Sequence, residues 1–250
     1  MIRNSKFLFQ VLRLHPRFII HVGAHLGQDR DDYLISQAGN IIWVEADPAT
    51  ASELQNKYPQ DKVINFAIWD VGNISIDLHR FAHEEQNSLI PPVKNNPKFL
   101  ANVSSIQVKT ITLDQLFDSL DLFRLGKGWI TIDIQGAELH ALNGATRALK
   151  HIDYLVIEIA NTSQGYAETP SLREVEAILS HSGLYRSLSR ISHDQSYTDH
   201  LFIRGSKSER VKIQILDSLF QTATYFLHLL RWKHLKSNPF HCEKCHFSAE

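Results

Sequence analysis

Cysteine is nearly absent from this chain: Cys242 and Cys245 are the two cysteines in 250 residues. Two cysteines this close together cannot form the disulfide framework of a secreted domain, and their scarcity favours a reducing compartment. Long hydrophobic runs are missing as well. The longest uncharged apolar stretch, 218–230, is shorter than the roughly 20 residues that a membrane span requires. We therefore expect a cytoplasmic protein with no stable membrane span.

An excess of charge of either sign is also missing, because 26 lysines and arginines nearly balance 27 aspartates and glutamates. No overall field draws the chain toward nucleic acid or an anionic membrane, so we expect no nucleic-acid partner. The hydrophobic content of 43% is sufficient for a full core. These values are typical of an ordinary globular protein.

A metal site is not expected, although one segment offers possible ligands. His241, Cys242, Cys245 and His246 lie close together near the C-terminal end, but no second Cys/His pair at the spacing of a structural zinc site accompanies them. We interpret this segment as a tail without metal. The alternatives are a zinc site completed by another chain and, less favoured, a c-type haem attached through Cys-x-x-Cys-His.

Apolar runs that alternate with amphipathic segments indicate an α/β fold. Residues 18–22, 40–44 and 62–67 are expected strands, and three strand-helix units in the first 70 residues are typical of a parallel sheet. A polar excursion follows at 71–97. Further strands are expected at 105–109, 129–134, 154–160, 185–190 and 200–204, and further helices at 113–120, 137–150 and 172–181.

The chain is predicted to consist of one domain, 1–205, which begins with a short helix at 1–16, and a C-terminal extension, 206–250. A long amphipathic helix, 209–235, precedes the Cys/His tail in this extension. We expect the helix to pack on its own domain. The alternatives are pairing with a second copy in a homodimer and contact of its basic end with a membrane surface.

Two glycines follow the first expected strand. Gly23 and Gly27 lie between an apolar strand and a helix-like segment, in Val-Gly-Ala-His-Leu-Gly-Gln at 22–28. Glycine permits positive φ and lets a ligand approach the backbone, beside amide groups that a helix start leaves unpaired. The turn therefore favours a nucleotide pocket. An ordinary strand-to-helix turn is the alternative, because two glycines alone are a weak signal.

An acid, Glu45, ends the second expected strand, 22 positions after Gly23. In a doubly wound fold, a carboxylate at this place accepts hydrogen bonds from the two ribose hydroxyls of a nucleoside. Asp29, Asp31 and Asp32 crowd the first turn of the helix that follows the two glycines, and they would repel a pyrophosphate. S-adenosylmethionine, which carries a sulfonium cation and no phosphate, therefore fits better than a dinucleotide.

Two further acids, Asp133 and Glu158, lie near the carboxyl ends of neighbouring expected strands, where open parallel sheets bind their ligands. Side by side they would form an acidic floor. Such carboxylates can hold the ammonium group of the cofactor, attract its sulfonium end, or take a proton from an attacking hydroxyl. The alternative is that one of them caps a helix or forms a salt bridge.

Six segments form a recognisable set of motifs: Val-Gly-Ala-His-Leu-Gly-Gln at 22–28, Val-Glu-Ala-Asp-Pro at 44–48, 65–70, Asn-Ser-Leu at 87–89, 108–114, and Ile-Asp-Ile-Gln-Gly-Ala-Glu-Leu-His-Ala-Leu-Asn-Gly-Ala at 132–145. Over roughly residues 18–204 the chain resembles the FkbM family of S-adenosylmethionine-dependent methyltransferases. The resemblance implies a Rossmann-like class I methyltransferase fold, with helices on both faces of a seven-stranded, mostly parallel sheet whose last strand is antiparallel. It also implies O-methylation of a hydroxyl on a sugar, glycan or other natural product.

Carried over by position, the resemblance also implies the cofactor site. The residues concerned are His21, Gly23, Ala24, His25 and Gly27 for the methionine half, Glu45 for the ribose, Ala67 and Ile68 for the adenine edge, and Asp133 near the transferring methyl. The chain departs from the family pattern at two positions. His21 replaces a frequent acid, and Thr131 replaces a usual lysine.

Asp133 and Glu158 are the predicted catalytic residues, and Asp133 is the first candidate for the base or for a group that orients the acceptor. Methyl transfer is an in-line displacement, so positioning dominates and a base need only remove a proton. The loop 83–102 is expected on the acceptor side. Alternative bases are His79, His83 and His140, because the ordinary histidine pKa is close to neutral.

Two other functions stay open at this point. A Rossmann-like protein could bind a ligand or a partner without catalysis, and His21 and Thr131 motivate this alternative. A NAD-dependent oxidoreductase is less favoured, because the chain lacks Gly-x-Gly-x-x-Gly. For the methyltransferase, the expected second substrate is a small molecule or a glycan.

Overall fold

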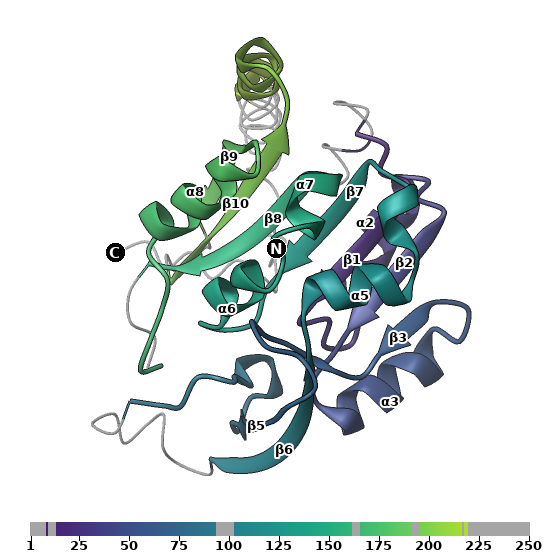
Figure 1. Cartoon of the computed structure of the whole chain (residues 1–250), viewed down its shortest axis with the longest axis vertical. Coiled ribbons are helices and arrows are strands. Elements are labelled where there is room, and N and C mark those ends of the chain that lie inside the picture. The colour runs from purple at the N-terminus through teal and green to yellow at the C-terminus, as the bar shows by residue number, and fades with distance from the viewer. Residues whose placement is uncertain are drawn as a thin grey trace, which may run out of the picture.

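The computed structural model describes residues 9, 14–93, 103–161, 166–191, 196–216, 218 and 219. In this part of the chain the main sheet has seven strands, in the order β3-β2-β1-β7-β8-β10-β9 (Figure 1). β10 is antiparallel to β8 and β9, and the other neighbouring pairs are parallel. The expected sheet is confirmed. Its strands are β1 (Phe18–Val22), β2 (Asn40–Val44), β3 (Lys62–Ile64), β7 (Gly128–Ile132), β8 (Ile152–Ala160), β9 (Leu184–Ile191) and β10 (Tyr197–Arg204).

Helices cover both faces of this sheet, and β1 shows why. All five of its residues are buried, since alternate side chains point to opposite faces. Phe18, Ile20 and Val22 belong to the core under α5 (Leu113–Ser119), α6 (Glu138–Asn143), α7 (Ala148–His151) and α8 (Leu172–His181). Ile19 belongs to the opposite core, under α2 (Arg30–Ile35) and α3 (Pro48–Lys57).

A second, three-stranded sheet forms beside the first from β4 (Ala67–Ile68), β6 (Ser104–Ile111) and β5 (Ser75–Arg80). The expected strand at 62–67 is therefore wrong at its end, because β3 stops at Ile64 and the chain turns into the small sheet. The side-chain amide of Asn65 holds this turn by donating to the carbonyl oxygens of Glu45 and Ala46, at 2.9 and 3.1 Å. Two short 3-10 helices, η1 (Glu84–Gln86) and η2 (Leu122–Arg124), complete the connections.

The single helix expected at 137–150 is wrong, because the structure has two helices there, α6 and α7. A Cβ atom at Gly144 would lie 2.4 Å from a backbone carbonyl oxygen of a neighbouring loop, so this position packs tightly against that loop. The carboxylate of Asp114 accepts hydrogen bonds from the backbone N–H groups of Arg147 and Ala148, at 2.9 and 2.7 Å. These bonds satisfy free donors at the start of α7 and so begin a separate helix.

Both terminal helices expected from the sequence lie largely outside the described residues. From the expected helix at 1–16, Phe9 is helical and buried, with its ring 5.0 Å from that of Trp129. From 209–235, a helix at 207–216 is described, and its Ile213 packs into the core on the α2 side of the sheet. The Cys/His tail lies outside the described residues. Within the described part, no helix is both long enough and apolar enough to cross a membrane.

Candidate active site

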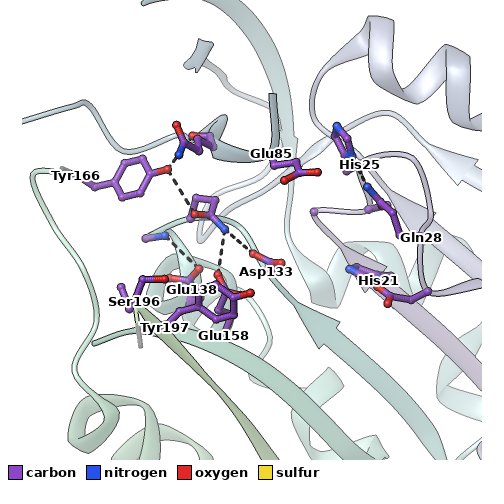
Figure 2. A pocket seen from close by; sticks show the side chains of 17 residues that line it. His21, His25, Gln28, Glu85, Asp133, Glu138, Glu158, Tyr166, Ser196 and Tyr197 are labelled. Atoms are coloured by element: carbon purple, nitrogen blue, oxygen red, sulfur yellow. Dashed lines mark hydrogen bonds and ion pairs between the residues drawn. The ribbon is translucent and has the colours of Figure 1, made fainter. Parts of the chain in front are cut away.

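A cavity of about 510 Å³ opens at the carboxyl ends of β1, β7 and β8 (Figure 2). Its wall carries five carboxyl groups, and none of the described residues that line it is a lysine or an arginine. We call this cavity the acidic chamber. The carboxyl groups are those of Asp29, Glu85, Asp133, Glu138 and Glu158.

A narrow cavity of about 60 Å³, the apolar slot, adjoins the chamber. The two cavities share Gly23, His25, Glu85, Asp133 and Gln135 in their walls. The wall of the slot also contains the carboxylate at the end of β2 and apolar side chains of the small sheet. Its further lining residues include Glu45, Ala67, Ile68, Leu78 and Leu89.

Gly23 brings the ends of three strands together. Its φ is +80°, and a Cβ atom there would lie 1.7 Å from the carbonyl oxygen of Asp133. Its N–H donates to the carbonyl oxygen of Val44, at 3.0 Å. The glycine is thus needed for the close approach of β1 to β7, as well as for the backbone turn that lines the site.

Gly27 has a packing role in the structure. It also has positive φ, at +65°, and a Cβ atom there would come within 2.8 Å of the Leu54 side chain on α3. Gly27 lines neither the chamber nor the slot. Its place in the cofactor site therefore stays a prediction, whereas Gly23, Ala24 and His25 do line the chamber.

The Glu45 carboxylate is held by two backbone N–H groups. His25 donates to Oε2 at 2.8 Å, and Asp47 donates to Oε1 at 2.9 Å. Burial raises the pKa of Glu45, and these two hydrogen bonds act against that increase. Each carboxylate oxygen has a second lone pair, so the side chain can still accept hydrogen bonds from a ligand in the slot.

Asp133 and Glu158 converge as the sequence predicts. The side-chain amide of Gln135 donates to both of them, at 2.7 Å to Asp133 Oδ1 and at 3.1 Å to Glu158 Oε1. Burial, followed by the nearby charge of Asp133, raises the pKa of Glu158 to about 9. Burial also raises the pKa of Asp133. Glu158 therefore holds its proton near neutral pH when no cation lies beside the pair.

Other acids around the pair are shifted in the same direction. Burial raises the pKa values of Asp29 and Asp199 to about 6. It raises that of Glu138 to about 7, although Glu138 accepts hydrogen bonds from the backbone N–H groups of Ile134 and Gly136. Each of these carboxyl groups would ionise more readily beside a bound cation.

The two departures from the family pattern meet in one buried network. His21 and Thr131 are direct neighbours on β1 and β7. The hydroxyl group of Tyr33 lies 2.9 Å from His21 Nδ1 and 2.9 Å from Thr131 Oγ1. Burial lowers the pKa of His21 to about 3, so this side chain is neutral in the chamber wall. His21 can therefore contribute a hydrogen bond to a ligand, but no charge.

The three alternative histidine bases do not line the chamber or the slot. His79 Nδ1 lies 2.9 Å from the hydroxyl group of Ser105 on the surface. His140 Nδ1 lies 2.8 Å from Asp70 Oδ2, and its ring stacks on that of Trp69 at 3.6 Å. His83 caps η1. From the loop at 83–102, Glu85 and Gln86 reach the chamber, and 94–102 lies outside the described residues.

The chamber also contains residues that the sequence patterns did not predict, among them Gln135, Glu138 and Tyr166. Gln135 and Glu138 belong to the most specific motif, so their closeness to Asp133 in the sequence could have indicated that they line the same site. Tyr166 lies on a loop after β8 and reaches the chamber through a tertiary contact with Gln86, whose carbonyl oxygen accepts from its hydroxyl at 2.8 Å. No local pattern indicates that contact.

Comparison with known proteins identifies the family of this chain. The sequence matches a family described as "Methyltransferase FkbM domain" over residues 21–187. No curated protein matches significantly. The similar solved structures include magnesium protoporphyrin IX methyltransferase from Synechocystis with bound SAM (9% identity, TM-score 0.46, covering 80% of this chain and 76% of that one). They also include an S-adenosylmethionine-dependent methyltransferase from Clostridium acetobutylicum (10% identity, TM-score 0.44, covering 81% and 91%).

The sheet order, with its antiparallel β10, is that of the Rossmann-like class I methyltransferase fold that the motifs imply. The family match spans more than half of the chain and includes the ends of β1, β2, β7 and β8, from which the chamber and the slot are built. The chain belongs to the FkbM family of methyltransferases.

Proposed function

We propose that this protein transfers the methyl group of S-adenosylmethionine to a hydroxyl group of a sugar, glycan or other natural product. The observation that carries the proposal is the acidic chamber, whose buried carboxyl groups have raised pKa values and no basic partner among its described lining residues. S-adenosylmethionine is the cofactor of this family, and its ammonium and sulfonium groups supply cations of the kind that such a chamber favours.

The residues present fit this cofactor. Glu45 is held so that it can accept from ribose hydroxyls, and Ala67 and Ile68 offer an apolar edge for adenine in the same slot. The methionine half fits the chamber, beside Gly23 and Asp133. Because the slot measures about 60 Å³, we expect the segment from η1 to Leu89 to move outward when adenosine binds.

When bound, the cofactor supplies an electrophilic methyl group on a sulfonium cation. The acceptor oxygen forms the new C–O bond as the C–S bond breaks, and its proton goes to a carboxylate of the Asp133–Glu158 pair. Loss of the sulfonium charge removes the cation that had favoured ionised carboxylates. The proton affinity of the pair therefore rises as the hydroxyl must lose its proton.

Calorimetric titration with S-adenosylhomocysteine and with NAD tests the proposal. We expect S-adenosylhomocysteine to bind and NAD not to bind, because the acids around the chamber repel a pyrophosphate. Binding of NAD alone would favour the oxidoreductase alternative. Binding of neither ligand would exclude both enzymes and favour a non-catalytic interaction protein. The protein supplied with S-adenosylmethionine can then be screened against candidate acceptors for methyl transfer.

A homodimer formed through the C-terminal helix is also part of the proposal. Ile213 packs inward, while Val211, Ile215 and Leu219 are 41%, 55% and 62% exposed at a spacing of four residues. This spacing places them on one helix face, which a second copy of the chain would cover. The mass in solution, measured by light scattering, is expected to fall from dimer to monomer in Ile215→Glu. A monomeric wild type would contradict this part.

A further inference from the structure

Gln135 is the point at which the polar side chains of the acidic chamber converge. Its Nε2 donates to Asp133 at 2.7 Å and to Glu158 at 3.1 Å. These two acids are labelled in Figure 2. A primary amide has two N–H donors, and both are used in these contacts. Its Oε1 lies 3.4 Å from the hydroxyl group of Tyr166, which can donate to it. One side chain thus connects β7, β8 and the loop that carries Tyr166.

The backbone of Gln135 is held in a conformation that is uncommon for a residue with a side chain. Its φ is +52°, and that of Gly136 is +103°. The hydroxyl group of Ser88 donates to the carbonyl oxygen of Gln135 at 2.7 Å. The Glu138 carboxylate accepts from the N–H groups on either side of Gln135, at 3.3 and 3.1 Å. Strain of this kind persists where the surroundings impose it, and it is common at functional sites.

We propose that Gln135 is a positioning residue, whose side-chain amide holds Asp133 and Glu158 together from a single point beside the cofactor. The inference rests on the proposed function, because the pair is held ready for a cationic ligand. A lysine or an arginine in this place would also donate to both acids, but it would neutralise them. A glutamate would offer no donor. An amide holds the pair and leaves its negative charge available to the ligand.

Hydrogen bonds to the ionised forms of Asp133 and Glu158 favour those forms, against burial and mutual repulsion. Loss of the amide would therefore make the pair ionise at a higher pH. In the described part of the chain, other ionisable groups surround the pair, and of these Tyr166 loses its contact with Gln135 Oε1 in Gln135→Met. They are His21 on β1, Asp29 before α2, Glu85 on η1, Glu138 on α6, Tyr166 and Asp199 on β10.

The test compares the affinities for S-adenosylmethionine and S-adenosylhomocysteine, by calorimetry from about pH 6 to about pH 9. The second ligand lacks the sulfonium charge, so the ratio of the two affinities reports the negative charge of the pair. Gln135→Met removes the amide at similar length. Gln135→Asn shortens the side chain and keeps an amide that tolerates positive φ. Gln107→Met is the matched control, since Gln107 donates to Asp77 on the exposed surface of the small sheet.

For the wild type and Gln107→Met, we expect the preference for S-adenosylmethionine to increase with pH along one common curve. In both Gln135 variants the midpoint should move up by about one pH unit, and the preference at neutral pH should fall about tenfold. An equal loss of affinity for both ligands with an unchanged midpoint would overturn the inference, as would loss of the fold in both variants by circular dichroism. If the wild type binds neither ligand, the proposed function fails, and the inference fails with it.

Discussion

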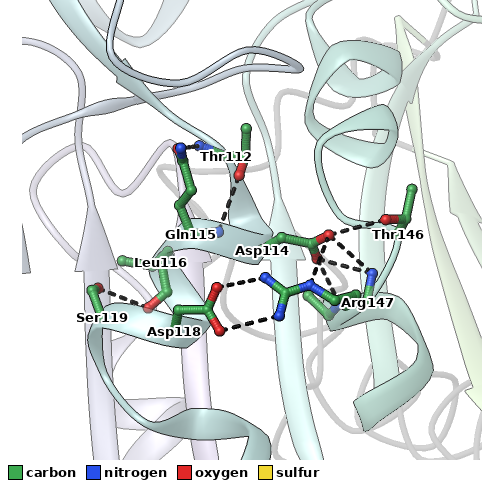
Figure 3. Close-up of polar contacts among 9 residues, drawn as sticks. Thr112, Asp114, Gln115, Leu116, Asp118, Ser119, Thr146 and Arg147 are labelled. Carbon is green, nitrogen blue, oxygen red and sulfur yellow. Dashed lines mark hydrogen bonds and ion pairs between the residues drawn. The ribbon is translucent and has the colours of Figure 1, made fainter.

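Two groups of carboxylates in this protein have opposite surroundings. At the start of α7, Asp114 accepts from the backbone N–H groups of Arg147 and Ala148, and the guanidinium of Arg147 pairs with Asp118 (Figure 3). The hydrogen bond from Arg147 lowers the pKa of Asp118. In the acidic chamber, by contrast, burial raises the pKa of Glu158 to about 9.

The two groups differ in the cations that the described residues place beside them. The Asp114 cluster has its own cation and its own backbone donors, so it serves to join α5 to α7. In the chamber, the described lining residues offer neutral donors such as Gln135 and no lysine or arginine. Buried acids with no basic side chain among the described residues around them are unfavourable when ionised. We infer that their charge partner is the ligand.

The largest effect is expected from Asp133→Asn, which removes a negative charge from the chamber at nearly constant size. We expect methyl transfer to an identified acceptor to fall about 10²- to 10⁴-fold, because a base is lost, while the circular dichroism spectrum stays unchanged. Asp118→Asn is the matched control in the other cluster, with turnover expected at the wild-type rate. Wild-type turnover in Asp133→Asn would rule out Asp133 as the base.

The next largest effect is expected from Glu45→Ala in the slot. Hydrogen bonds from ribose to a carboxylate are charge-assisted, so their loss should weaken binding of S-adenosylhomocysteine roughly tenfold to hundredfold in calorimetry. Glu45→Gln retains the shape of the side chain and should reduce the affinity for S-adenosylhomocysteine by less. Asp77→Asn, on the surface, should bind as the wild type does. An unchanged affinity in Glu45→Ala would mean that this acid does not contact the ribose.

The dependence of stability on pH should separate the two groups of carboxylates. Burial raises the pKa of Glu158 in the native state to about 9 from an ordinary 4.5, so between these values the unfolded state binds fewer protons. The contribution of Glu158 to the free energy of unfolding therefore decreases as pH rises. The lowered pKa of Asp118 has the opposite sign, and its contribution is lost as pH falls through the acidic range.

Urea unfolding from about pH 5 to about pH 9 measures this difference. In Glu158→Gln the free energy of unfolding should fall between these pH values by at least about 1 kcal/mol less than in the wild type. The reason is that the substitution removes the carboxyl group that ionises only at high pH. Asp118→Asn should leave that slope unchanged. Parallel curves for Glu158→Gln and the wild type would contradict the raised pKa.

The smallest effect is expected from substitutions in the Asp114 cluster. Asp114→Ala removes the acceptor at the start of α7 and should lower the free energy of unfolding by about 1 kcal/mol. Asp114→Asn, which keeps one acceptor oxygen, should lower the free energy of unfolding by less. Binding of S-adenosylhomocysteine to the folded protein should not change in either variant. A weaker affinity would show that the two regions are coupled.

Much of the site could be predicted from the sequence because of one property of parallel sheets. Glu45, Asp133 and Glu158 each lie at or near the carboxyl end of an apolar strand, and such ends meet at one edge. The order of the strands therefore places Asp133 and Glu158 in the wall of the chamber and Glu45 in the slot beside it. The family motifs then identify the chemistry of that edge as methyl transfer.

The remainder depends on tertiary contacts that local patterns do not contain. Gln135 faces both acids because its φ is positive, and this conformation is imposed by Ser88 and Glu138. The network of His21 with Thr131 requires the register of β1 and β7 as well as Tyr33 from α2. Polar contacts of this kind are set by the packed fold, so they become visible only in the structure.

The most direct test of the central claim is to count the protons that leave the protein when S-adenosylmethionine binds. Calorimetry near neutral pH, repeated in buffers of different ionisation enthalpy, gives this number. We predict release of about one proton or more, because cations of the ligand favour the ionised forms of Glu158 and its neighbours. Tight binding with no proton release would contradict the claim that the ligand is the charge partner of the acidic chamber.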